Sequence, residues 1–331
     1  MKEILNRLTQ HETLESSEAE KILIGIAEGQ YNHSQISAFL TVFMMRTITL
    51  NELEGFKKAL QKLCLSIDLN EFSPIDLCGT GGDGKDTFNI STLASFVTAG
   101  SGINVSKHGN YGVSSGCGSS NVLEYLGIKF SNDADFLKRC IDQAGICNLH
   151  APLFHPAMKN IAPIRKELGV KTFFNMLGPL VNPASPKYQL TGVFNLELAR
   201  LYGYLFQNSK QQFTILYALD GYDEISLTGN AKAIRNKGEF IINASDFGIH
   251  SLKAEEITGG MNIPSSAKIF TKVLDGKGSE AQNNVVCANA AMAIATVTDC
   301  SPKKGFEKAM ESLMSGKANQ VFKRLKRLSS K

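Results

Sequence analysis

The sequence predicts an α/β fold, with a small N-terminal helical domain followed by a larger α/β domain around a mostly parallel central sheet. In the first part of the chain, apolar residues recur at helical intervals, and Ser17–Glu20 and Thr49–Glu52 have the spacing of capping boxes. From Ile75 onward, short apolar runs alternate with helical or glycine-rich segments, which is typical of parallel strands connected by helices. We therefore assign residues 1–70 to the helical domain and residues 71–331 to the α/β domain.

Residues 155–185 interrupt this alternation. The segment has a helical pattern again and is punctuated by four prolines, Pro156, Pro163, Pro179 and Pro183. We expect part of it to leave the sheet and rejoin the N-terminal helical domain.

Composition excludes several classes of protein. The 331 residues are 43% hydrophobic, and 35 basic against 31 acidic residues give a formal net charge of +4, which is too small for a protein that binds duplex nucleic acid. The seven cysteines form no CxxC pair, which favours reduced thiols in a reducing compartment. The first twenty residues lack the apolar core of a signal peptide, and no apolar stretch approaches the roughly 20 residues that span a bilayer. These features predict a cytoplasmic protein that binds neither membrane nor nucleic acid.

A glycine-rich segment follows the first predicted strand. The apolar run Ile75–Cys78 leads into Gly79–Lys85, and an apolar helix begins near Ser91. Glycines let backbone N–H groups approach a ligand closely, and a helix N-terminus adds unpaired donors and a partial positive charge. The segment therefore predicts a phosphate-binding loop.

Two better-known glycine motifs fit this loop incompletely. Gly79, Gly81 and Gly84 match the dinucleotide fingerprint, but the next predicted strand ends at Ser106 and Lys107 where an acid is required. The triphosphatase loop requires a Mg²⁺-binding hydroxyl after its lysine, and Asp86 stands there. Both alternatives therefore fail at a decisive position.

A second polar, glycine-rich loop runs from Lys107 to Ser115 and continues to Ser119. In a parallel sheet it opens on the same edge as the first loop, so both are expected to face one crevice. Lys107 supplies a full positive charge, and His108 and Asn110 are candidates to contact a second substrate. For His108, a hydrogen bond that orders the loop is an equally good interpretation.

Two adjacent acids, Asp223 and Glu224, follow the apolar run FTILYAL. Mg²⁺ prefers carboxylate and phosphate oxygens, so acids that face bound phosphates would form a metal site. Acids in a turn are commonly only solvated, and the two phosphate loops are what favour the metal.

Arg165 lies in the proline-punctuated segment. If Pro163 starts or kinks a helix, Ile161, Ile164 and Leu168 form an apolar stripe and Arg165 projects beside it. An arginine against an apolar flank is suited to bidentate binding of the carboxylate of an aromatic substrate. The alternative is an arginine that packs its stem and extends its head into water.

These segments occur together in an order that resembles the anthranilate phosphoribosyltransferase family, a branch of the nucleoside-phosphorylase-like phosphoribosyltransferases. The resemblance runs nearly end to end, through CGTGGDGKDTFNIST, KHGN with VSSGCGSSNVLEYLG, HPAMKNIAPIRKELGVKTFFNMLGPLVNP, GYDEISLTG and SLMSGKA. It implies a phosphoribosyltransferase-like fold, a homodimer formed through the helices, and Mg²⁺, with two ions expected per active site. The implied reaction joins 5-phosphoribosyl 1-diphosphate and anthranilate to give N-(5-phosphoribosyl)anthranilate and diphosphate, a step of tryptophan biosynthesis.

The resemblance also implies roles for individual residues. Ser91, Asp223 and Glu224 would hold Mg²⁺, while Gly79, Asn110 and Arg165 would bind anthranilate. Phosphoribosyl diphosphate would be held by Gly79, Gly82, Asp83, Thr87, Asn89, Ile90, Ser91, Thr92, Lys107, His108, Gly109, Asn110, Tyr111, Gly112, Val113, Ser114, Ser115 and Ser119.

The sequence departs from the family pattern in the second loop. Tyr111 and Gly112 stand where the family commonly has Arg-Ala, and Cys117–Asn121 replaces a common Ser-Gly-Ser-Ala-Asp. One cationic contact to phosphate is therefore missing, although Lys107 and the backbone donors remain.

The chemistry implied by the resemblance requires mainly stabilisation of the leaving diphosphate, in which Lys107 has an electrostatic role. The aromatic amine is already neutral at pH 7, so we expect no single essential general base. Two alternatives remain for a chain of this pattern: a pyrimidine nucleoside phosphorylase, which carries an extra C-terminal domain, and a binding protein that has lost catalysis.

Overall fold

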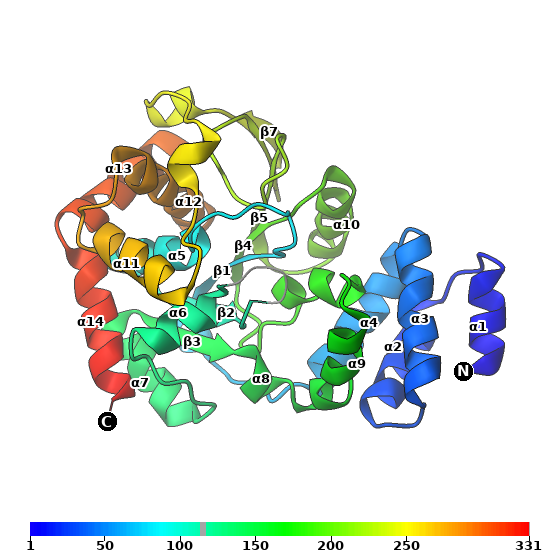
Figure 1. The fold of residues 1–331 in the computed structure, drawn as a ribbon. Helices are drawn as coiled ribbons and strands as arrows, with labels where there is room; N and C mark the ends of the chain where they lie inside the picture. The colour runs from blue at the N-terminus through cyan, green and yellow to red at the C-terminus, as the bar shows by residue number, and fades with distance from the viewer. Residues whose placement is uncertain (113–116, 331) are drawn as a thin grey trace. The chain divides into compact units, whose positions relative to one another are not determined.

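The computed structural model describes residues 1–112 and 117–330 (Figure 1). Three residues of the predicted second loop, Val113, Ser114 and Ser115, lie outside the described residues. The chain forms two compact units. The first combines Met1–Ile67 with Ala151–Pro183, and the second combines Asp68–His150 with Ala184–Lys331.

The first unit is helical. Its α-helices are α1 (Lys2–Thr9), α2 (Ser16–Ala27), α3 (His33–Met45), α4 (Leu50–Leu63), α8 (Ala151–Phe154) and α9 (Ala162–Leu168). Three 3₁₀ helices complete it: η2 (Pro156–Asn160), η3 (Phe173–Met176) and η4 (Gly178–Leu180).

One of the two predicted capping boxes is present. The Thr49 hydroxyl accepts a hydrogen bond from the Glu52 N–H, and the Glu52 carboxylate accepts one from the Thr49 N–H, at the start of α4. The box predicted at Ser17–Glu20 is wrong, because α2 already begins at Ser16. The Glu20 carboxylate forms an ion pair with Lys62 instead, 3.7 Å away.

An aromatic cluster forms the core of the first unit. Phe39 and Phe43 from α3, Phe56 from α4 and Phe173 from η3 pack on one another. Phe56 and Phe173 are stacked, with ring centroids 4.3 Å apart. The segment that returns after the α/β part thus supplies part of this core.

The second unit contains a seven-stranded sheet in the order β3-β2-β1-β4-β5-β6-β7, which confirms the predicted mostly parallel sheet. The first five strands of this order pair in parallel, β6 pairs antiparallel with β5, and β7 pairs antiparallel with β6. The strands are β1 (Ile75–Gly79), β2 (Val105–Gly109), β3 (Ile146–His150), β4 (Tyr188–Gly192), β5 (Gln212–Ala218), β6 (Ala231–Arg235) and β7 (Gly238–Ile242).

Helices cover both faces of this sheet. In Figure 1, α5 and α12 lie together on one side of the strands and α10 lies on the other. The helices of the unit are α5 (Ile90–Gly100), α6 (Ser119–Tyr125), α7 (Ala134–Ala144), α10 (Leu196–Gln207), α11 (Ile263–Leu274), α12 (Glu280–Thr298), α13 (Pro302–Met314) and α14 (Lys317–Ser329), with 3₁₀ helices η1 (Asn70–Phe72), η5 (Ala244–Phe247) and η6 (Ala254–Ile257).

The strand order fixes where a ligand can enter. From β1 the chain winds outward through β2 and β3, and then returns to the other side of β1 as β4. In open α/β sheets, ligands bind at such a switch point, outside the carboxyl ends of the two central strands. The ends of β1 and β4 are therefore the expected place for a site.

Among the described residues, no single helix is both long and apolar enough to cross a bilayer, although α12 and α13, bent by 116° at their break, meet the length and composition criteria as a pair.

Candidate functional site

The glycine loop leaves the end of β1, and its conformation explains its composition. Gly81, Gly82 and Gly84 have φ angles of +64°, +77° and +74°, in the left-handed region that other residues adopt at a cost. The loop then reaches α5, whose first residues, Ile90 and Thr92 among them, are buried. Because the first N–H groups of an α-helix have no carbonyl partner within the helix, the N-terminus of α5 offers backbone donors at the end of this loop.

The acid loop, residues 219–230, meets the glycine loop at the same sheet edge. The carboxylate of Asp223 accepts a hydrogen bond from the N–H of Gly81 at 2.6 Å. At Gly79 an added Cβ would lie 3.1 Å from the carboxyl carbon of Asp223, and closer still to its oxygen. The absence of a side chain at the end of β1 is thus what lets the acid loop approach.

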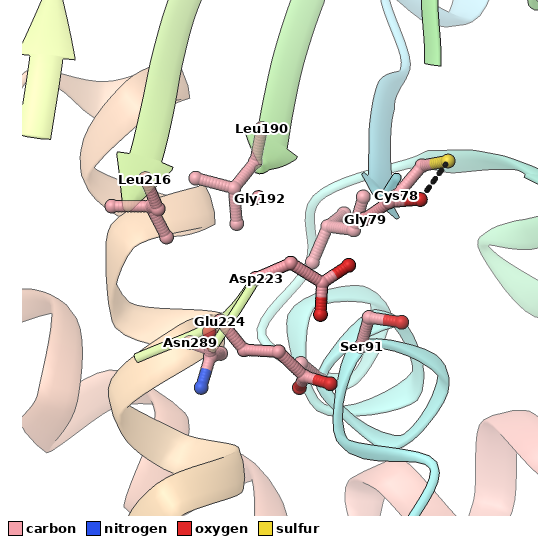
Figure 2. Close-up of a pocket in the computed structure, with 11 residues that line it drawn as sticks. Cys78, Gly79, Ser91, Leu190, Gly192, Leu216, Asp223, Glu224 and Asn289 are labelled. Atoms are coloured by element: carbon pink, nitrogen blue, oxygen red, sulfur yellow. Dashed lines mark hydrogen bonds between the residues drawn. The ribbon is translucent and has the colours of Figure 1, made fainter. Parts of the chain in front are cut away.

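Figure 2 shows the pocket that results, at the ends of β1, β4 and β5. Asp223 and Glu224 extend from the acid loop toward the part of α5 that carries Ser91. The pocket is lined by Leu77, Cys78, Gly79, Ser91, Ala94, Leu190, Gly192, Leu216, Asp223, Glu224 and Asn289. The three predicted metal-binding residues therefore share one pocket.

The pKa values of both carboxyl groups are raised, because burial and neighbouring acids disfavour their charged forms. Burial, and secondly the charge of Asp83, raises the pKa of Asp223 to about 7. Burial, and secondly the charge of Asp223, raises the pKa of Glu224 well above its ordinary value. One carboxylate oxygen of Glu224, Oε2, is buried without a hydrogen-bond partner among the described residues.

This donor set fits a hard divalent cation. A positive charge would reduce the repulsion between two adjacent buried carboxylates, and the Ser91 hydroxyl provides a third oxygen-bearing side chain. Within residues 1–112 and 117–330, no group of three or more His, Cys, Asp or Glu side chains could hold a metal. A site with few protein ligands suits Mg²⁺, which keeps several waters and binds phosphate oxygens.

The predicted cation of the second loop is buried at the end of β2. Lys107 is only 3% exposed, and its ammonium group donates to the carbonyl of Leu77 at 2.6 Å. The N–H of His108 donates to the carboxylate of Asp76, 3.0 Å away in β1. The charge of Lys107 offsets part of the rise in the pKa of Glu224, so this ammonium group acts on the acid pair.

The beginning of the second loop is closed onto α6. The carbonyl of Asn110 accepts hydrogen bonds from the Ser119 hydroxyl and the Ser120 N–H, at 3.3 and 3.2 Å. Gly109 lies against Ser119, where an added Cβ would come within 2.7 Å of its hydroxyl. The two phosphate loops also meet directly, since the side-chain amide of Asn89 donates to the carbonyl of Cys117 at 3.2 Å.

Tyr111 and Gly112 also contact residues of α6. The Tyr111 hydroxyl lies 3.3 Å from the Glu124 carboxylate, and its ring packs at 80° to that of His150, with centroids 4.8 Å apart. The N–H of Gly112 donates to the side-chain carbonyl of Asn121 at 3.0 Å. The loop is thus held here by contacts that involve no cation.

Asp83 is placed by a hydrogen bond within the glycine loop, and Thr87 by a bridge to a distant segment. The Asp83 carboxylate accepts from the N–H of Lys85, which closes the turn of the glycine loop. Thr87 forms an isolated antiparallel bridge with Thr258. The second half of the glycine loop therefore packs against the segment before α11.

Arg165 belongs to the first unit and lies on α9. Its guanidinium group donates to the side-chain carbonyl of Asn175 at 3.2 Å and stacks over Phe174, 5.1 Å from the ring centroid. Its Nε is buried without a hydrogen-bond partner among the described residues, and burial lowers its pKa. Ile161 and Ile164 are buried beside it, so Arg165 is held against an apolar flank with one donor to spare.

Two polar residues of the site were not singled out from the sequence. Asp76 interrupts the apolar strand β1, and its carboxylate accepts from the backbone of His108. Asn289 lies inside the alanine-rich helix α12 and pairs with the backbone of the acid loop. The only signal in the sequence is a polar residue within an otherwise apolar run.

Comparison with known proteins assigns the chain to a family. Two family models match it: the glycosyl transferase family helical bundle domain over residues 2–64, and the glycosyl transferase family α/β domain over residues 72–319. The chain is 68% identical over 329 residues to an anthranilate phosphoribosyltransferase of Flavobacterium psychrophilum, covering 99% of this chain and 100% of that protein. It is 66% identical to that of Christiangramia forsetii, with 99% of both chains covered.

Solved structures agree with these relatives. The anthranilate phosphoribosyltransferase of Thermus thermophilus superposes with a TM-score of 0.91 at 29% identity, covering 99% of each chain. That of Saccharomyces cerevisiae, in complex with PRPP and Mg, gives a TM-score of 0.90 at 26% identity, covering 98% of this chain and 96% of the yeast chain. On the combined strength of the fold, the family models and these relatives, the chain belongs to the anthranilate phosphoribosyltransferase family of glycosyl transferases.

Proposed function

We propose that the protein transfers the 5-phosphoribosyl group from 5-phosphoribosyl 1-diphosphate to the amine of anthranilate, giving N-(5-phosphoribosyl)anthranilate and diphosphate in tryptophan biosynthesis. The observation that carries this proposal is the meeting of the glycine loop, the N-terminus of α5 and the buried acid pair in one pocket at the sheet switch point. The yeast relative in complex with PRPP and Mg supports the same substrate and metal.

The site is suited to stabilising a leaving group. Breaking the bond between ribose C1 and diphosphate places negative charge on the diphosphate, so donors fixed in advance lower the barrier. Backbone N–H groups of the glycine loop and of the α5 N-terminus are such donors, and the buried charge of Lys107 adds to their field. We assign Lys107 this electrostatic role.

Ser91, Asp223 and Glu224 are proposed to hold Mg²⁺, and two ions are expected per active site. Bound there, Mg²⁺ would neutralise charge on the diphosphate oxygens. The remaining residues assigned to phosphoribosyl diphosphate in the sequence are retained in this proposal, with Val113, Ser114 and Ser115 outside the described structure.

Anthranilate is proposed to bind through Gly79, Asn110 and Arg165. The spare Nε donor of Arg165 and its stacked position on Phe174 suit a carboxylate on an aromatic ring. Because the aromatic amine is neutral at pH 7, it needs orientation rather than deprotonation, and no single general base is required.

We further propose a cytoplasmic homodimer that associates through the helical domain, assigned to residues 1–70 with part of 155–185. Met44, Met45 and Leu65 are large apolar side chains on the first unit that are 44%, 80% and 48% exposed, which suits a protein interface. All seven cysteines are thiols in the structure, as suits a reducing compartment.

A direct assay tests the activity. The protein is mixed with Mg²⁺, 5-phosphoribosyl 1-diphosphate and anthranilate, and the loss of anthranilate fluorescence is followed, with and without EDTA. We expect a loss that requires both the protein and the metal. No loss under any condition, with phosphorolysis of thymidine by the same sample, would overturn the proposal in favour of a nucleoside phosphorylase.

A further inference from the structure

Asn289 makes an unusual pair of hydrogen bonds beside the acid pair. It lies in the middle of α12, is 4% exposed and lines the same pocket as Asp223 and Glu224 (Figure 2). Its side-chain carbonyl accepts from the N–H of Ile225 at 3.0 Å, and its side-chain amide donates to the carbonyl of Ile225 at 2.9 Å. Both backbone groups of the residue after Glu224 are thus held by one side chain.

This pairing has the hydrogen-bond pattern of an antiparallel strand pair. A neighbouring strand would normally exchange an N–H and a carbonyl hydrogen bond with one residue, and an amide side chain offers the same two groups. The acid loop closes at its ends through a hydrogen bond from the N–H of Leu219 to the carbonyl of Asn230, at 2.8 Å. Its middle is held from the helix side by Asn289.

The amide of Asn289 has only one workable orientation. The N–H of Ile225 can only donate, so the side-chain oxygen must face it, and the nitrogen then faces the carbonyl of Ile225. The same nitrogen also donates to the carbonyl of Val285 one helical turn earlier, at 2.9 Å. The side chain is therefore fixed to its own helix by one hydrogen bond and to the acid loop by two.

The acid pair is held from the other side by the ends of the strands. Asp223 accepts from the Gly81 N–H, and its backbone packs against Gly192 at the end of β4. Asn289 and these strand ends therefore determine, between them, how deep the acid loop lies in the pocket. If Asn289 is removed, the buried N–H and carbonyl of Ile225 lose their partners, and a shift toward water that restores them carries Glu224 along.

We propose that Asn289 is a positioning residue for the metal site, one that keeps Asp223 and Glu224 aimed at the space they share with Ser91. The inference rests on the proposed Mg²⁺ role of this acid pair. Groups that orient metal ligands typically contribute 10- to 100-fold to metal affinity. Replacing Asn289 should therefore weaken metal binding by more than the accompanying loss of folding stability explains.

Thr296 provides a matched control on the same helix. Its hydroxyl is buried and pairs with that of Thr214 in β5 at 2.6 Å, so it also joins α12 to another element through a polar contact. It does not line the pocket. Thr296→Val therefore removes this buried hydrogen bond, and the one from the same hydroxyl to the carbonyl of Met292, without touching the acid loop.

The test uses Mn²⁺ as a paramagnetic substitute for Mg²⁺, with free Mn²⁺ counted by electron paramagnetic resonance in the presence of 5-phosphoribosyl 1-diphosphate. We expect Asn289→Ala to weaken Mn²⁺ binding by roughly tenfold or more, and Thr296→Val to stay within about twofold. In turnover assays, the KM for Mg²⁺ should rise in Asn289→Ala while kcat at saturating Mg²⁺ recovers. Thermal unfolding of each variant gives the loss of stability for comparison.

The outcomes separate this inference from the proposed function. If wild type binds Mn²⁺ and Asn289→Ala binds it equally well, Asn289 does not position the metal site. Equal weakening in Asn289→Ala and Thr296→Val also overturns the inference, since the effect is then general. If Asp223→Asn binds Mn²⁺ as tightly as wild type, the metal assignment itself is wrong. Should Asn289→Ala fail to fold, Asn289→Ser is measured against the same criteria.

Discussion

Replacing Gly192 with alanine tests how closely the acid loop is packed on β4. An added Cβ at Gly192 would lie 2.5 Å from the carbonyl carbon of Asp223 and closer still to its oxygen, whereas real Cβ atoms essentially never come within 3.0 Å of such atoms. Both partners are backbone, so no side chain can rotate away. The loop or the strand must move by on the order of 1 Å, a misplacement that costs roughly 100-fold in rate when it reaches catalytic groups.

We therefore expect Gly192→Ala to lower kcat/KM by about 100-fold, or about 2.7 kcal/mol, in the anthranilate fluorescence assay. Gly203→Ala is the control, because an added Cβ in α10 meets only Ile234 at an ordinary 3.6 Å. That variant should keep its activity and gain about 0.5–1 kcal/mol of stability, as alanine does in a helix. A folded Gly192→Ala protein whose kcat/KM lies within threefold of wild type would refute the reasoning.

Three further predictions concern charged groups. Burial raises the pKa of Asp223 from 3.8 to about 7. In EDTA, the stability that this group contributes is therefore fully present below its unfolded pKa and is lost as pH rises through 7. Urea denaturation should show the free energy of unfolding falling from pH 5 to 8, and falling less in Asp223→Asn. Glu52 is fully buried and paired with Arg46, so Glu52→Gln should lower the free energy of unfolding by roughly 3 kcal/mol in the same assay. Glu307 is in an exposed ion pair, so the control Glu307→Gln should lower it by less than about 1 kcal/mol. Arg165→Lys loses the planar, two-donor geometry and should raise the KM for anthranilate about tenfold or more with the KM for 5-phosphoribosyl 1-diphosphate changed little; equal changes in both constants would contradict the assigned role.

Local patterns were enough to predict the helical start of the chain, the five parallel strands and the position of the glycine loop. Glycines that adopt positive φ, such as Gly81 and Gly84, leave a direct mark on the sequence because few other residues tolerate that conformation. Parallel strands do the same, because strands buried on both faces form continuous apolar runs.

Other features depended on contacts that no local pattern shows. The apolar run Ile128–Phe130 looks like a strand, but it forms none, and Phe130 stacks on His150 instead, with centroids 4.5 Å apart. The hairpin of β6 and β7 was not predicted, because its strands are short and β7 is exposed along most of its length. Asn289 reaches Ile225 across 64 positions of sequence, so its partner is known only once the chain has folded.

The split of the first unit along the chain has a consequence for synthesis on the ribosome. Phe173 stacks on Phe56, but more than a hundred residues of the chain are made between them, which takes on the order of ten seconds at 5–20 residues per second. Until then, the aromatic cluster of α3 and α4 lacks the ring of Phe173, which contacts Phe39, Phe43 and Phe56 in the folded unit. Chaperones that bind exposed aromatic residues would therefore meet this protein at its first domain, early in translation, and a chain truncated before residue 173 should remain bound to them.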